Sequence, residues 1–165
     1  MRTHHRRRAA ASAEALWEAA RGVRLCDTRR LAPLVRWRIP GVPSAATYYE
    51  LFRDYPFILL DAGETWAVSG LCGRIWTLAR DYPRLAGPEA FRDWDERGTV
   101  RVLIAHWTEP DGDGGAEIVS ETRVDPVDAT ARVRLRALWT VISPFERLVG
   151  AEPLEVAAHR AERAG

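Results

Sequence analysis

Residues 99–125, with the sequence TVRVLIAHWTEPDGDGGAEIVSETRVD, decide the fold. Thr99–Thr108 and Ala116–Asp125 are rich in β-branched and aromatic residues, and the Gly- and Asp-rich residues 109–115 between them form a turn. The two runs therefore predict an antiparallel β-hairpin. In one register apolar side chains gather on one face and Arg101 lies beside Asp125, whereas a shift of one residue mixes apolar and charged positions on both faces. We adopt the first register.

This register assigns a face to every side chain of the hairpin. The face expected to point inward carries Val100, Val102, Ile104 and His106 beside Ile118, Ser120, Thr122 and Val124. The outward face carries Arg101, Leu103, Ala105 and Trp107 beside Val119, Glu121, Arg123 and Asp125. Glu121 and Arg123 therefore share the outward face, where an ion pair on the sheet surface is favoured over an acid–base couple.

Shorter elements are predicted before this hairpin. Residues 57–60 and 65–71 flank a turn and form a second hairpin, and residues 73–77 are read as a further short strand. One helix is predicted after Ser12, whose side chain caps it. A second helix is predicted after Asp27, and Pro33 limits it to one or two turns. A third runs from Pro88 to Gly98. The N-terminal segment 2–8 is rich in basic residues and includes His4 and His5. For this segment an exposed edge strand is favoured over a metal site or a nucleic-acid-binding arm.

The tail after Asp128 is predicted to be helical. Its apolar residues recur at helical spacing at Ala131, Leu135, Leu138, Trp139 and Ile142. The sequence Ser143-Pro144-Phe145-Glu146 is typical of a helix start, and Gly150 and Pro153 indicate another break. The pattern therefore predicts a helical tail interrupted at these two places.

Length and composition indicate one globular domain, residues 1–165. The chain has 47% hydrophobic and 28% charged residues, and its net charge of +1 implies no general attraction to nucleic acid or to an anionic membrane. A secretory signal and an apolar run of about 18 residues are both missing from the sequence, so we expect a cytoplasmic protein without a membrane span.

Several segments together resemble the START-like, or SRPBCC, superfamily of polyketide cyclase/dehydrase and lipid-transport proteins. The most specific are Ser120–Val124 with the following Asp128, and Leu138–Phe145. Ser12–Trp17 and Gly70–Trp76, with its Gly-Arg-x-Trp sequence, are also similar to an actinobacterial branch of that superfamily. The resemblance implies an α+β helix-grip fold, in which a curved antiparallel sheet wraps around a long C-terminal helix and encloses an apolar cavity.

Such a cavity implies binding of a small hydrophobic or aromatic molecule, polyketide-like or lipid-like, because burial removes its surface from water. We expect the lining to include Trp37, Trp66, Trp76, Val102, Ile104, Ser120, Thr122, Leu135 and Trp139. The aromatic residues among them also suit an ordinary packed core. Ligand binding without chemistry is the leading hypothesis.

One alternative is a cofactor-independent polyketide cyclase or dehydratase. In that hypothesis a cavity imidazole, His106, moves protons and Arg74 orients an enolate or carboxylate. The competing interpretations are a structural histidine and an arginine that pairs with a surface Asp or Glu. A second alternative is a protein-interaction module that uses the outward face at Leu103 and Trp107, which also allows a homodimer.

Other classes of enzyme lack their motifs in this sequence. Gly112–Gly115 lies in a hairpin turn and is followed by neither a helix nor a Lys, and GxSxG, HExxH and zinc spacings do not occur. The sequence therefore predicts no cofactor, no metal and no nucleic-acid partner.

Overall fold

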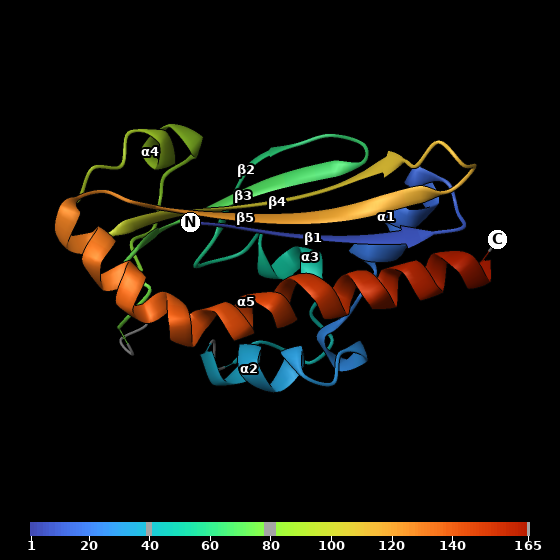
Figure 1. Ribbon diagram of the computed structural model, residues 1–165, viewed down its shortest axis with the longest axis horizontal. Coiled ribbons are helices and arrows are strands. Elements are labelled where there is room, and N and C mark those ends of the chain that lie inside the picture. Colours follow the sequence, from blue (N-terminus) through green and yellow to red (C-terminus); the bar gives the residue numbers. More distant parts are fainter. Residues whose placement is uncertain (39–40, 78–81, 165) are drawn as a thin grey trace.

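The computed structural model describes residues 1–38, 41–77 and 82–164, with the side chains of residues 38 and 140–149 outside that description. One antiparallel sheet, in the order β1-β5-β4-β3-β2, lies across a long C-terminal helix (Figure 1). The strands are β1 (Arg2–Ala9), β2 (Ile58–Ala62), β3 (Trp66–Gly73), β4 (Val100–Pro110) and β5 (Ala116–Pro126), and the helix is α5 (Ala129–Ala164). The predicted α+β class and the pairing of sheet and terminal helix are confirmed.

The register of the central hairpin is the predicted one. Arg101 pairs with Asp125, Val102 with Val124 and His106 with Ser120. The inward face of β4 and β5 is buried at Val102, Ile104, Ile118 and Val124. Register was predictable because side chains alternate between the two faces, so a slip of one residue would expose the apolar set to water.

The prediction of an interrupted tail was wrong. Helix α5 runs unbroken for 36 residues, and both Pro144 and Pro153 stand inside it. A proline in a helix interior costs about 3 kcal/mol because one hydrogen bond is lost. The helix tolerates Pro153 because the segment after it is held by burial, at Leu154, Ala157, Ala158 and Ala161. The expected cap at Ser143 lies outside the described side chains.

Three short α-helices and one 3-10 helix, η1 (Leu25–Asp27), lie between β1 and β2 in the described part of the chain. In α1 (Ala13–Arg21) the Ser12 hydroxyl accepts the Ala15 N–H at 3.2 Å, as predicted. The short helix expected after Asp27 is present as α2 (Leu31–Arg38). Helix α3 (Tyr48–Leu51) was not predicted, although Thr47 and Glu50 form a capping box at its start.

Two predicted bounds differ from the structure. Residues 74–77 form a turn and not a strand, because Gly73 has a φ of 138° and the Arg74 carbonyl then accepts both the Thr77 N–H and the Thr77 hydroxyl. Helix α4 (Pro88–Arg92) ends well before Gly98. Gly98 has a φ of 73°, and its N–H donates to Asp128 at 2.7 Å, so it serves the loop that leads into β4.

The two faces of the sheet have different neighbours. Helix α5 and α1 lie on the inner face, whereas α4 lies on the outer face and α2 lies beyond α5, away from the sheet (Figure 1). On the outer face a Cβ added at Gly70 would come within 2.6 Å of the Phe91 ring of α4. Gly70 is therefore the position at which α4 approaches the sheet closely.

A single carboxylate of α5 holds the start of α2. Glu152 accepts the backbone N–H groups of Arg29, Arg30 and Leu31 at 2.7–3.2 Å. Leu31 is the first residue of α2 and Arg29 and Arg30 directly precede it, and the first N–H groups of any helix have no partner within the helix. Glu152 thus acts as a helix cap supplied by a distant segment, and it fixes α2 against α5.

We predict that Glu152→Ala lowers the free energy of unfolding by about 1–2 kcal/mol, the usual cost of a lost helix cap. Denaturant unfolding followed by circular dichroism measures the change. Glu155→Ala is the matched control, because Glu155 forms an exposed ion pair with Arg7 and should cost less than about 1 kcal/mol. Equal losses in both variants would contradict the assigned role of Glu152.

Candidate functional site

An aromatic cluster occupies the inner face of the sheet at one end of β4. It consists of Tyr48 and Phe52 from α3 and its C-cap, Phe57 just before β2, and His106 from β4. The Tyr48 hydroxyl and His106 Nε2 share a hydrogen bond of 3.1 Å. Ring centroids lie 4.9 Å apart for Tyr48 and Phe52, 5.1 Å for Phe52 and Phe57, and 5.3 Å for Phe52 and His106. The cluster therefore forms one continuous aromatic wall.

His106 is the basic member of this wall. The residue is partly buried, and desolvation of the imidazole lowers its pKa to about 4. The ring is consequently neutral at physiological pH, and one of its nitrogens is engaged by Tyr48. A neutral imidazole with a fixed hydrogen bond can orient a ligand, whereas a pKa near 4 makes it a weak base.

A small hollow adjoins His106 on the side of α1 and α5. It has a volume of about 20 Å³ and is lined by Trp17, Ala20, Arg21, Tyr48, Tyr49, His106, Ile118, Pro153 and Leu154. That volume suits about one water molecule, whereas pockets for drug-sized ligands usually exceed about 300 Å³. Between these residues the expected ligand-sized cavity is therefore closed in this conformation, and a larger guest has to displace side chains.

A second feature lies at the opposite end of the interior. Gly73 at the end of β3 pairs with Val100 of β4, and Val100 pairs with Pro126 of β5. The residues after Gly73 therefore lie at the end of these strands that is close to the start of α5. Trp76 and Trp139 are partly buried against the core here. The indole Nε1 of Trp76 is buried and donates to no acceptor in the described part of the chain. An unsatisfied buried donor costs about 1–3 kcal/mol.

The structure brings most of the expected lining residues to the interior. Val102, Ile104, Ser120 and Thr122 lie on the buried inward face of β4 and β5, and Leu135 of α5 is 1% exposed. Sequence reasoning missed Tyr48 and Phe52, because α3 was not predicted. Their signal was the capping sequence Thr47-x-x-Glu50 together with Tyr48 and Phe52, which are spaced one helical turn apart.

Two tryptophans expected in the lining lie elsewhere. Trp66 is on the outer face of the sheet, opposite Trp107, because the β3–β4 register turns Ala67 and not Trp66 inward beside His106. Trp37 is 61% exposed on α2. Its helix packs beyond α5, so the side chain cannot reach the space between α5 and the sheet (Figure 1).

The two candidate catalytic residues are not brought together. Arg74 follows the end of β3, whereas His106 pairs with Ala67 near the start of that strand. The guanidinium of Arg74 is half exposed and lies 3.9 Å from the carboxylate of Glu96, which is the surface pairing that competed with a catalytic role.

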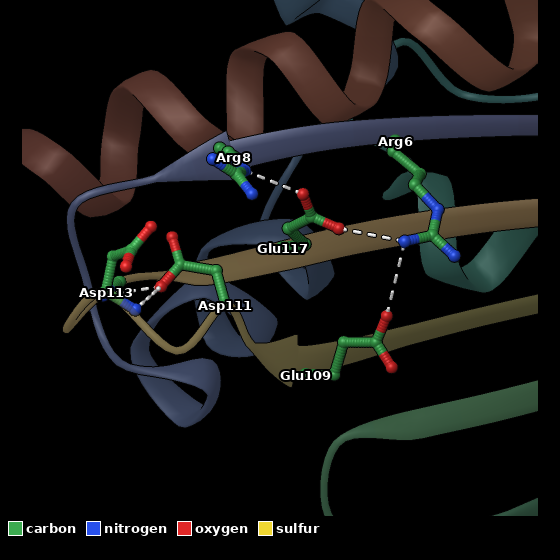
Figure 2. A network of polar contacts seen from close by, with 7 residues as sticks. Arg6, Arg8, Glu109, Asp111, Asp113 and Glu117 are labelled. Carbon is green, nitrogen blue, oxygen red and sulfur yellow. Dashed lines mark hydrogen bonds and ion pairs between the residues drawn. The ribbon is translucent and has the colours of Figure 1, made fainter.

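The basic N-terminal strand is an edge strand, as predicted, and its arginines are paired with acids of β5, β4 and α5. Arg8 donates to Glu117 at 2.8 Å, and Arg6 bridges Glu117 at 3.1 Å and Glu109 at 3.7 Å (Figure 2). These pairs cancel much of the positive charge of β1 in sequence positions 6–8.

The predicted ion pair between Glu121 and Arg123 is also present. The two side chains are joined by a hydrogen bond, and Arg2 of β1 adds a second ion pair to the same carboxylate. Burial raises the pKa of Glu121, but the two guanidinium groups outweigh burial and lower it overall. Glu121 is therefore a charged structural group on the outer face.

Comparison with known proteins gives two likenesses, and no family model matches the chain. The curated protein 3-hydroxy-5-methyl-1-naphthoate 3-O-methyltransferase of Streptomyces sahachiroi is 32% identical over 146 residues, which cover 70% of this chain. The chain spans only 42% of that protein's length. The solved structure of TTHA0849 from Thermus thermophilus aligns with 100% of this chain and 99% of its own, at 12% identity and a TM-score of 0.37. Neither likeness assigns the chain to a family.

We predict that His106 makes stability depend on pH. Its folded-state pKa of about 4 lies below the unfolded value of about 6.5, so the unfolded chain takes up the proton first. The contribution of the neutral imidazole to the free energy of unfolding is complete above a pH of about 6.5 and is lost as the pH falls toward about 4. The free energy of unfolding should fall by about 2 kcal/mol between a pH of about 7 and a pH of about 5.

Urea unfolding at several pH values measures this effect. His106→Gln should abolish the part of the decrease that lies between neutral pH and a pH of about 5. His159→Gln, which changes an exposed histidine of α5, should retain the full decrease. An identical pH profile for the wild type and His106→Gln would show that the imidazole is not held neutral by the fold.

Proposed function

We propose that this protein binds a small, mainly aromatic molecule carrying an oxygen acceptor, in the interior between the inner face of the sheet and α5. A sheet packed against a long terminal helix is an architecture consistent with small-ligand binding.

The Trp76 indole carries the proposal. Its buried N–H meets no acceptor in residues 1–38, 41–77 and 82–164, which destabilises the free protein, and a ligand oxygen at that position would satisfy it. Trp76 lies beside apolar and aromatic groups, so its donor would be the polar contact that orients an otherwise apolar guest. Aromatic side chains at this end favour a flat ring system by offset or edge-to-face contact.

The aromatic cluster supports the same ligand class. Tyr48, Phe52 and Phe57 offer ring surface, and the neutral His106 adds a polar group without a charge that an apolar guest would have to desolvate. The short helix α3 carries two of these rings, and rearrangement of a four-residue helix is a small change by which the closed hollow beside His106 would open.

The name of the Streptomyces relative contains a bicyclic aromatic hydroxy acid, a naphthoate. Because this chain matches less than half of that protein, the name serves here only to choose probes. 1-Naphthol is a bicyclic aromatic with one oxygen, and naphthalene has the same rings without it. The pair isolates the contribution of the oxygen acceptor.

We predict that the protein binds 1-naphthol more tightly than naphthalene, and that Trp76→Phe weakens 1-naphthol binding about fivefold while leaving naphthalene binding unchanged. Phenylalanine keeps an aromatic ring and removes the N–H. Isothermal titration calorimetry measures both affinities.

Trp107→Phe is the matched control, since Trp107 lies on the outer face of the sheet and should leave both affinities unchanged. The proposal is contradicted when Trp76→Phe and Trp107→Phe give the same affinity for 1-naphthol, or when neither probe binds the wild type.

A further inference from the structure

The segment around α2 concentrates positive charge in a chain that is almost neutral. Between Thr28 and Tyr49 the sequence has four arginines and no Asp or Glu, whereas the whole chain has a net charge of +1. Arg29, Arg30 and Arg36 are exposed, and none of the three forms an ion pair with the described parts of the chain. Their guanidinium groups therefore face solvent without an ion-pair partner among the described residues, unlike those of Arg6 and Arg8 in β1.

The acids closest along the chain or in space keep their negative charge, but none of them forms an ion pair with Arg29, Arg30 or Arg36 in the described parts of the chain. The Glu152 carboxylate accepts the backbone N–H groups at the start of α2, so its charge lies beside Arg29 and Arg30 and offsets part of theirs, whereas Arg36 lies further along the helix. Glu50 accepts the Thr47 N–H at 2.7 Å in the capping box of α3. Asp27 pairs with Arg160 of α5 at 2.7 Å. Each acid is engaged in holding the fold.

Apolar side chains share this basic surface. Trp37 is 61% exposed, the largest apolar side chain of α2 turned to solvent in the described ranges. It lies with Ala32, Pro33, Arg36, Gly41 and Val42 around an open surface hollow of about 620 Å³. Helix α2 lies on the side of α5 that faces away from the sheet, so this surface is not needed to close the interior (Figure 1).

We propose that this face of α2, with Gly41 and Val42, docks on the surface of an anionic lipid bilayer. The arginines would lie at lipid phosphates, and Trp37 would lie at the level of the headgroups, where an indole is favoured. Across the described residues no helix is long and apolar enough to cross a membrane, so the contact is peripheral. The inference goes beyond ligand binding and does not depend on it.

A lipid surface fits these residues better than a nucleic acid does. Single-stranded nucleic acids are usually held by several aromatic side chains on which successive bases stack, set along a basic groove. The α2 surface presents one exposed aromatic ring beside Pro33 and Val42, which add aliphatic surface suited to acyl chains and not to base stacking. Arg36 and Trp37 lie together at the hollow, and a basic group beside exposed apolar area is a feature of sites that bind membrane surfaces.

Co-sedimentation with lipid vesicles tests the inference on the full chain. We expect binding to vesicles of phosphatidylcholine with phosphatidylglycerol, weaker binding as salt rises, and little binding to phosphatidylcholine alone. Arg30→Gln with Arg36→Gln should lower partitioning about 25-fold, since each basic group near an anionic surface contributes about fivefold. Trp37→Ala should lower partitioning while keeping the dependence on salt.

Arg92→Gln with Arg97→Gln is the charge-matched control, because these arginines belong to α4 and the loop after it, on the other side of the sheet. It should leave partitioning unchanged. Equal binding to both kinds of vesicle, equal losses in the two double variants, or displacement from anionic vesicles by a single-stranded oligonucleotide at low concentration would overturn the inference. Calorimetry with 1-naphthol is a separate measurement, so its failure and the failure of vesicle binding are distinguishable.

Discussion

The close approach of α5 to the inner face of the sheet governs the arrangement of the other elements. It depends on small side chains: Gly150 lies so near β1 that an added Cβ would come within 2.1 Å of the His5 ring, and Ala157, Ala158 and Ala161 continue the contact as buried residues. Because the helix lies this close, its other side is available to hold further segments. Glu152 fixes α2 there, and Arg160 donates to the Gly22 carbonyl at 3.0 Å.

The same close packing sets the cost of every polar group left inside. Packing of α5 on the sheet keeps His106 neutral by burial and makes the indole N–H of Trp76, which meets no acceptor among the described residues, costly. Stability alone would favour apolar residues at both positions. Polar groups at both positions are expected when the interior has to bind a ligand as well as pack against α5, and this agrees with the proposed ligand class.

The sequence predicted much of the sheet and less of the site. Alternation of side chains fixed the β4–β5 register and hence the inward position of His106, Ser120 and Thr122. Trp66 was misplaced because its strand was not assigned a face, and Trp37 because nothing local indicates on which side of α5 its helix packs. The unbroken α5 could not be predicted either, since local signals at Pro153 favour a break and only tertiary burial overrides them.

Solution NMR of the seven indole N–H groups, each assigned by substitution of its tryptophan with phenylalanine, tests the central claim most directly. Titration with 1-naphthol should move the Trp76 indole proton downfield, as a new acceptor reaches it, while the Trp66 and Trp107 resonances of the outer face stay in place. An unchanged Trp76 resonance at saturating 1-naphthol, or shifts confined to Trp66 and Trp107, would contradict a ligand site between the sheet and α5.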